Sequence, residues 1–134
     1  MLHFELPWPP SVNTLYRAIP RGKHCQNILS AKGRAYFDQA KAYFDYQGTR
    51  PEEPISSHVE LKLFLHPPNK RIIDIDNRQK AVIDALVKCG VLEDDSVNVV
   101  RQIHTYYCSR VTDGSVVVEI HDCSEYKDDD LTDG

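Results

Sequence analysis

Residues 58–66, HVELKLFLH, decide the fold class of this 134-residue chain. Apolar side chains recur at every second position, which is the period of a strand with one buried face. The strand is ended by PPNK, residues 67–70, because proline cannot donate a ladder hydrogen bond. We therefore expect a strand whose buried face carries Val59, Leu61, Leu63 and Leu65.

Two helices are expected, one on each side of this strand in the sequence. Ser30 caps the first, which runs to about Gln47 and ends at Gly48. The second runs roughly from Asn77 to Cys89 and ends at Gly90. The positions spaced to face the core are Phe37, Ala40 and Phe44 in the first helix and Val82, Ile83 and Leu86 in the second.

The ends of the chain predict further strands. LHFEL, residues 2–6, alternates and is stopped by PWPPS, whereas the segment from Ser11 to Leu29 has no clean period and indicates a basic loop. VNVVRQIHTYY (97–107) and SVVVEIH (115–121) predict two strands joined as a hairpin across Asp113-Gly114. The resulting order, β-α-β-α-β-β, predicts a two-layer α+β domain with a small mixed sheet.

Composition limits the class of protein. An apolar fraction of 41% in 134 residues is typical of one folded domain. No segment resembles a membrane span or a secretion signal, so we expect a cytoplasmic protein without a membrane partner. The four cysteines form no C-x-x-C pair, which favours reduced thiols over a zinc site or a disulfide framework.

The net charge of −4 is unevenly distributed. From Glu119 onward the chain holds seven acidic residues and one basic residue, which leaves thirteen acidic and fifteen basic residues in positions 1–118. The body is thus slightly positive, at +2, which is compatible with a nucleic-acid partner. We interpret the acidic end as a solvated tail. A tail that mimics DNA and screens the body is the alternative.

The stretch IIDIDNRQKAVIDAL, residues 72–86, places two carboxylates where an extended run gives way to a helix. In an extended segment Asp74 and Asp76 point to one side and can converge on a cation, and a further acid follows in LEDDSVN. Lys80 lies one helical turn past Asp76 and can reach the same pocket. Carboxylates, a cation and a lysine suit phosphodiester hydrolysis. A plain capping role for Asp76 or Asn77 is the structural alternative.

Other proteins with D-x-D motifs fit less well. An EF-hand calcium loop requires other residues at positions 78, 79 and 85, where this chain has Arg78, Gln79 and Ala85. A haloacid-type phosphatase needs a doubly wound parallel sheet, for which the chain is short, and is the weaker alternative. A sugar-nucleotide transferase meets the same limit of size.

The combination of motifs resembles a known family. DIDNRQKAVIDALVKCGVLEDDSVN (74–98) has the pattern D-x-D-N-x-x-K, then Asp84, a glycine stop and D-D, and LPWPPSVNTLYR (6–17) matches the opening segment of the same family. Both resemble the RusA family of Holliday junction resolvases. The resemblance implies a RusA-like endonuclease domain over residues 1–121, followed by the acidic tail, residues 122–134.

What the resemblance implies is specific. Family members are homodimeric endonucleases of recombination and repair, often encoded by phages or prophages, that cut four-way junctions by paired symmetric nicks. They use Mg²⁺, for which Mn²⁺ can substitute. The metal-binding acids fall on Asp74, Asp76 and Asp95 and the catalytic lysine on Lys80. Spacing favours Asp95 over Asp94.

DNA contacts are expected from a separate set of residues: Asn13, Arg17, Lys70, Arg71 and Arg78. The chain departs from some relatives in having Ile72 and Ile73, rather than an arginine run, before Asp74. The competing interpretation is a binding protein on the same fold, without catalytic activity. Three acids together with a lysine favour the enzyme, because clustered negative charge does not help a protein that merely binds DNA.

Overall fold

The structure is a computed structural model that describes residues 1–48 and 50–123. Its larger sheet has the strand order β1-β6-β4-β5, formed by Leu2–Pro7, Ser115–Asp122, Val59–His66 and Val100–Tyr107. The β4–β5 pair is parallel and the other two pairs are antiparallel. The predicted small mixed sheet in an α+β domain is confirmed.

Strand β4 is the centre of this sheet because it pairs with β5 on one side and β6 on the other. Its side chains alternate between buried and half-buried, as the sequence predicts. Leu61, Leu63 and Leu65 are completely buried. The alternation therefore marks a strand with one face against the core and with neighbours along both edges.

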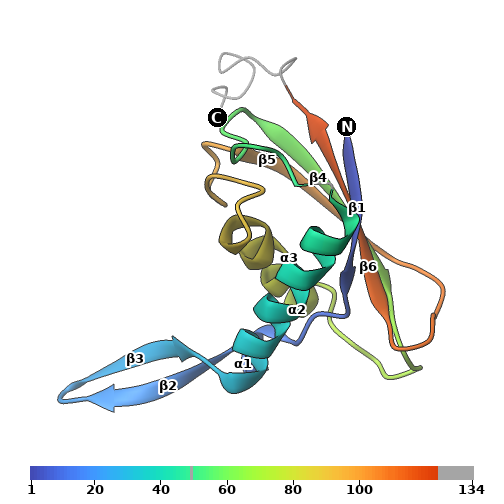
Figure 1. Ribbon diagram of the computed structural model, residues 1–134. Coiled ribbons are helices and arrows are strands. Elements are labelled where there is room, and N and C mark those ends of the chain that lie inside the picture. Colours follow the sequence, from blue (N-terminus) through green and yellow to red (C-terminus); the bar gives the residue numbers. More distant parts are fainter. Residues whose placement is uncertain (49, 124–134) are drawn as a thin grey trace, which may run out of the picture.

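Two helices cover one face of the sheet (Figure 1). Helix α2, Ala31–Gln47, begins at Ser30, whose Oγ accepts a hydrogen bond from the amide of Gly33, and ends at Gly48 in the left-handed conformation. Helix α3, Asp76–Lys88, lies beside it. Both predicted helices are confirmed. All six of the residues expected to face the core are buried: Phe37, Ala40, Phe44, Val82, Ile83 and Leu86.

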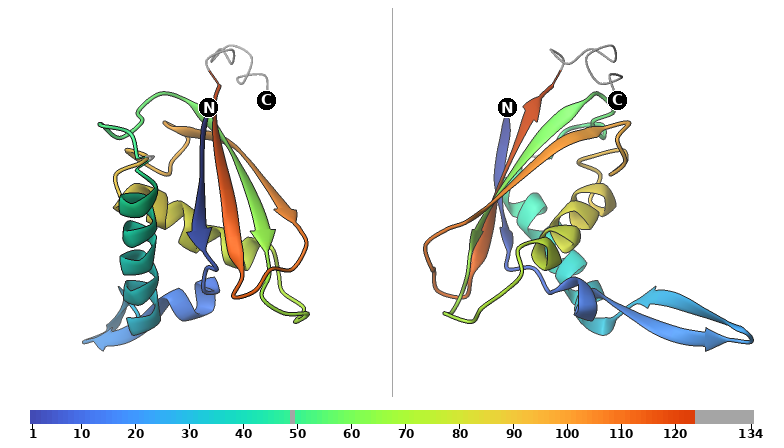
Figure 2. Two further views of the ribbon diagram at one scale, coloured as in Figure 1. Left: turned by 45° about the vertical axis from the view of Figure 1, so that its right-hand side comes forward. Right: turned by 180° about the vertical axis from the view of Figure 1, so that it is seen from behind.

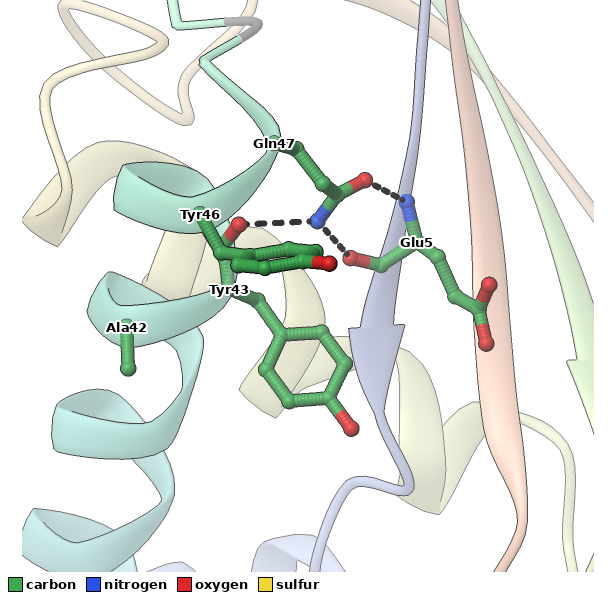
Figure 3. A pocket seen from close by; sticks show the side chains of 5 residues that line it. All are labelled: Glu5, Ala42, Tyr43, Tyr46 and Gln47. Atoms are coloured by element: carbon green, nitrogen blue, oxygen red, sulfur yellow. Dashed lines mark hydrogen bonds between the residues drawn. The ribbon is translucent and has the colours of Figure 1, made fainter.

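Helix α2 also covers part of the free edge of the sheet at β1. The Gln47 side chain donates to the carbonyl oxygen of Glu5 at 2.8 Å and accepts from the Glu5 amide at 2.9 Å (Figure 3). These two bonds imitate a neighbouring strand. Tyr43 and Tyr46 stand beside this contact, with Ala42 on the same helix.

The predicted hairpin between the last two strands is wrong. Strands β5 and β6 are not neighbours, because β4 lies between them and pairs with both. The Asp113-Gly114 turn does exist, with positive φ at both residues. This turn ends the connection that leads from the edge strand β5 past β4 to β6, which lies between β1 and β4. A local turn signal does not determine which strand becomes the neighbour.

The predicted basic loop between Ser11 and Leu29 is also wrong. This segment forms the short helix α1, Val12–Leu15, followed by strands β2, Tyr16–Arg21, and β3, His24–Leu29. The two strands pair with each other as an antiparallel hairpin and extend from the body (Figure 2). The hairpin lacks an alternating pattern because neither of its faces is buried along its length.

Helix α1 joins the hairpin to the body. The carbonyl oxygen of Leu15 accepts a hydrogen bond from the amide of Ser30 at 2.9 Å. A side chain at Gly33 would place its Cβ only 2.5 Å from that oxygen, so the close approach of α1 to α2 needs glycine there. Leu15 itself is fully buried.

The folded part of the chain reaches slightly beyond residue 121. Strand β6 continues to Asp122, and Cys123 is buried. The rest of the expected acidic tail, residues 124–134, lies outside the described residues. Within the described part of the chain, no helix combines the length and apolar character that a membrane crossing requires.

Candidate functional site: a carboxylate and lysine hollow on helix α3

Helix α3 begins at Asp76 without a capping side chain. Ile75 occupies the N-cap position in a helical conformation and makes no side-chain hydrogen bond to the helix. The capping alternative for Asp76 and Asn77 is therefore wrong. The Asn77 side-chain amide instead donates to the Asp74 carboxylate at 3.3 Å. The expectation that Asp74 and Asp76 share one extended segment is also wrong, since Ile75 between them is helical.

One face of α3 lines a hollow of about 240 Å³. Positions three and four apart on a helix lie on one face, and the loop before β5 closes the other side with Asp95. The lining side chains are Asp76, Gln79, Lys80, Ile83, Asp84 and Asp95. The structure thus brings Asp76, Lys80 and Asp95 together, as expected, and adds Asp84. Asp74 is exposed and is not among the lining residues.

Asp84 is the most constrained carboxylate of the hollow. Its Oδ1 accepts a hydrogen bond from Lys80 Nζ at 3.1 Å. Its Oδ2 accepts one from the hydroxyl of Tyr16 at 2.7 Å, across 68 positions of sequence. The Asp84 side chain is 13% exposed, whereas that of Lys80 is 47% exposed. Asp84 therefore holds the lysine at the rim of the hollow and links α3 to the base of the hairpin.

The position of Tyr16 changes its acidity. Burial, followed by the hydrogen bond to Asp84 and the negative charges of Asp84 and Asp95, raises the pKa of Tyr16 to about 12. Each of these effects disfavours the phenolate. The Tyr16 hydroxyl is therefore protonated at neutral pH and remains a donor to Asp84.

The two adjacent aspartates of the D-D pair have different surroundings. Asp94 accepts a hydrogen bond from the hydroxyl of Ser96, which lowers the pKa of Asp94. Asp95 is exposed and lines the hollow. The carboxylate that faces Asp76 and Lys80 is thus that of Asp95.

The charges of the hollow are unbalanced. Three carboxylates, Asp76, Asp84 and Asp95, and one ammonium, Lys80, line it, which gives a formal charge of −2. Within the described residues, no group of three or more His, Cys, Asp or Glu side chains is close enough to hold a metal ion. Mg²⁺, however, usually keeps several waters and needs only one or two carboxylates beside substrate phosphates. The oxygen donors of Asp76 and Asp95 fit such an ion.

A family model, Endodeoxyribonuclease RusA, matches residues 7–121. The chain belongs to the RusA family. It is 37% identical over 94 residues to the crossover junction endodeoxyribonuclease of Enterobacteria phage 82, covering 70% of this chain and 73% of that protein. It is 36% identical over 91 residues to the proteins of the same name from Escherichia coli K12 and Shigella sonnei, covering 68% of this chain and 71% of each.

Two residues of this RusA-family chain were missed as site residues by sequence reasoning. Asp84 stands in the quoted family pattern without a role, and its spacing of four from Lys80 was the available signal. Tyr16 gave no signal, because only the fold brings it to α3.

Tyr16 also lines a second hollow, of about 500 Å³, with Val12, Asn13, Asn27 and Lys80. Lys80 belongs to both hollows and joins them.

The expected DNA-contacting residues fall into three places. Asn13 lines the second hollow, and Arg17 is exposed on β2. Lys70 and Arg71 are exposed in the loop before α3. Arg78 is different, because its guanidinium donates to the carbonyl oxygen of Pro9 at 2.9 Å and lies 5.6 Å from the centroid of the Trp8 ring. Burial lowers the pKa of Arg78. Its contacts with Pro9 and Trp8 hold the N-terminal segment against α3.

The Tyr16–Asp84 bond can be tested through stability. Tyr16→Phe should lower the free energy of unfolding by about 1 kcal/mol at pH 8, since a part-buried acceptor loses its donor. Between pH 10 and about 12 the folded wild type keeps the Tyr16 proton, whereas the unfolded chain releases it. The folded state then binds more protons, so wild-type stability falls as pH rises. The difference in free energy of unfolding between wild type and Tyr16→Phe should therefore be smaller at pH 11 than at pH 8.

Urea unfolding at pH 8 and pH 11 measures this difference. Tyr46→Phe is the matched control, because Tyr46 is 92% exposed, and it should follow the wild type at both values. An equal difference between wild type and Tyr16→Phe at the two values would show that Tyr16 does not donate to Asp84 in solution.

Proposed function

We propose that this chain is a divalent-metal-dependent endonuclease that cuts four-way DNA junctions by paired, symmetric nicks. The observation that carries the proposal is the meeting of Asp76, Asp95 and Lys80 at one hollow in a chain of the RusA family. The relatives are named crossover junction endodeoxyribonucleases, which supports DNA as the substrate. A DNA-acting enzyme with four free cysteines belongs in a reducing compartment, and we place it in the cytoplasm.

The metal site of the proposal consists of Asp76 and Asp95. Asp74, the third ligand that the family resemblance implies, lies outside the hollow in this structure and would have to approach it to bind the same ion. The first two present oxygen donors to the hollow, which suits Mg²⁺, or Mn²⁺ in its place. Asp74 is exposed at the start of α3, three residues from its partner Asn77. When bound, the ion supplies an activated water and neutralises charge on the phosphate.

The hydrolysis adds water across one P–O bond, and this chain's own residues govern the charge. A fifth oxygen on phosphorus concentrates negative charge on the phosphoryl group, and the ammonium of Lys80 is placed to stabilise it. Asp84 holds Lys80 by a hydrogen bond at 3.1 Å, and Tyr16 holds Asp84 at 2.7 Å. Lys80 is thus a catalytic residue in this proposal, whereas Asp84 and Tyr16 are positioning residues.

DNA is held in this proposal by Asn13, Arg17, Lys70 and Arg71. Asn13 lines the second hollow with Lys80, Arg17 is exposed on β2, and Lys70 and Arg71 are exposed in the loop before α3. Arginine and lysine provide most of the affinity for phosphates, and that affinity depends on salt. Arg78 supports the site mainly from within, through Pro9 and Trp8.

Two alternatives from the sequence are less well supported. A haloacid-type phosphatase requires a doubly wound parallel sheet, whereas this sheet has four strands and one parallel pair. A binding protein without activity gives no reason for the formal charge of −2 at the hollow, which repels phosphate unless a cation is present.

Removing single carboxylates should separate cleavage from binding. Asp74→Asn, Asp76→Asn and Asp95→Asn should each abolish cleavage and leave junction affinity within about threefold, because the basic side chains that contact phosphates remain. Asp38→Asn, on the exposed side of α2, is the control and should cleave normally. Cleavage of a labelled four-way junction and gel-shift binding measure the two properties. Undiminished nicking by Asp76→Asn would contradict the assignment.

Lys80→Ala should reduce single-turnover cleavage by about 10²–10³-fold, as the loss of one transition-state charge partner typically does. The helix should remain folded, since alanine is a good helix former. Lys88→Ala is the matched control, because Lys88 is exposed in the last turn of the same helix. Circular dichroism checks the fold. A loss of helix in Lys80→Ala, or cleavage equal to that of Lys88→Ala, would remove Lys80 from the mechanism.

The protein should be a homodimer, because paired nicks on a two-fold symmetric junction need two equivalent sites and each chain offers one hollow of this kind in its described residues. Light scattering should give about twice the chain mass of 15.3 kDa. A supercoiled plasmid with a cruciform should become mostly linear, while one without an inverted repeat stays intact. A monomeric mass together with accumulating nicked circles would exclude paired cleavage.

A further inference from the structure

The hairpin formed by residues 16–29 is the part of the described chain that is most separated from the body. Strands β2 and β3 pair only with each other within the described residues, and Figure 2 shows their tip far from both helices and the sheet. Residues 20–27 are all exposed. Since an isolated two-stranded hairpin is only marginally stable in water, a bound partner would stabilise it.

The charge of the hairpin is opposite to that of the whole chain. Residues 6–37 contain five Lys or Arg residues and no Asp or Glu, although the net charge of the protein is −4. Three of the five, Arg17, Arg21 and Lys23, belong to the hairpin. A partner for this surface must therefore be strongly negative, as a nucleic-acid backbone is.

The strand register gathers this charge on one face. Arg21 lies opposite His24, and Arg17 lies opposite Ile28. Residues opposite each other in an antiparallel pair, and residues two or four apart in one strand, share a face. Arg17 and Arg21 therefore point to the same side, and Lys23 occupies the turn between the strands. The other face carries Ala18, Pro20, Cys25 and Asn27, which have no formal charge.

The base of the hairpin adjoins the candidate site. Tyr16, the first residue of β2, donates to Asp84, and Asn27 of β3 lines the second hollow together with Lys80. A six-residue strand spans about 20 Å, so the tip lies about that far from the base. Duplex DNA rises about 3.4 Å per base pair. The tip can thus reach phosphates about six base pairs from those at the hollow.

We propose that the hairpin is a DNA-binding ribbon whose basic face, Arg17, Arg21 and Lys23, contacts the backbone of one junction arm several base pairs away from the scissile phosphate. This inference rests on the proposed function and deepens it. A two-stranded ribbon has dimensions that the major groove of B-DNA admits. Contacts away from the cut site increase the affinity for substrates with full-length arms and add no group to the chemical step.

Arm length provides the test. Binding of the wild type and of the double variant Arg21→Ala/Lys23→Ala is measured in chelator, with junctions whose arms are about 15 or about 4 base pairs long. The wild type should bind the long-armed junction about tenfold or more tightly than the short-armed one. The double variant should bind both with the affinity that the wild type has for the short-armed junction.

Salt dependence gives a second readout. In the double variant on long arms, the slope of log affinity against log salt should be shallower by about 2 for each hairpin that contacts an arm, and so by about 4 in the homodimer, because each lost phosphate contact contributes about 0.9. Arg110→Ala is the control, because it also removes a positive charge from the protein surface. Arg110 is exposed in the connection between β5 and β6. That connection lies on the opposite side of the molecule from the hairpin (Figure 1), so Arg110→Ala should behave as the wild type.

Three results would overturn the inference. One is a double variant that keeps the wild-type preference for long arms. Another is an affinity loss that Arg110→Ala reproduces. The third is a double variant whose mass in light scattering is half that of the wild type. The hairpin would then be a contact between two copies of this chain. Failure of the proposed function has a different signature, because the wild type would then not cut the junction with magnesium, whatever its dependence on arm length.

Discussion

The Asp84 carboxylate is the contact on which the arrangement of the site depends. It accepts one hydrogen bond from Lys80 on its own helix and one from Tyr16 at the base of the hairpin. A half-buried carboxylate with two donors is strongly oriented, because losing either donor leaves an unsatisfied acceptor. The bond network therefore fixes the amine of Lys80, the hairpin and the exposed face of α3 relative to one another.

The four-stranded sheet supports helix α3, which carries the site. Strand β4 pairs on both edges and buries Leu61, Leu63 and Leu65, which gives α2 and α3 a firm surface. The opposite face of α3 remains open, and Asp76, Lys80 and Asp95 meet there. Asp76 and Asp95 give the hollow a negative charge that Lys80, already paired with Asp84, does not offset. A divalent cation is the simplest species that reconciles such a hollow with a phosphate substrate.

The sequence predicts best those elements that bury one face, because burial imposes a periodic pattern of apolar residues. Elements with one buried face, such as β4 and α2, show their period in the sequence and were predicted with nearly correct bounds. The β2–β3 hairpin was missed because neither of its faces is buried along its length, so Arg17 to Asn27 carry no period. The neighbour of β6 was predicted wrongly because Asp113-Gly114 reports a turn and not a pairing. Asp76 and Lys80 were predicted to lie together from helical spacing, whereas the contact of Tyr16 with Asp84 is a tertiary contact without a local signal.

Two labelled substrates show whether the α3 hollow belongs to a metal-dependent nuclease that is selective for four-way junctions. One is a four-way junction and the other is a linear duplex of the same sequence, each incubated with the protein in magnesium or in chelator. Paired, symmetric nicks are expected in the junction with magnesium only, and the duplex should stay intact under all conditions. Cleavage in chelator, equal cutting of the duplex, or an intact junction in magnesium would contradict this assignment of the hollow.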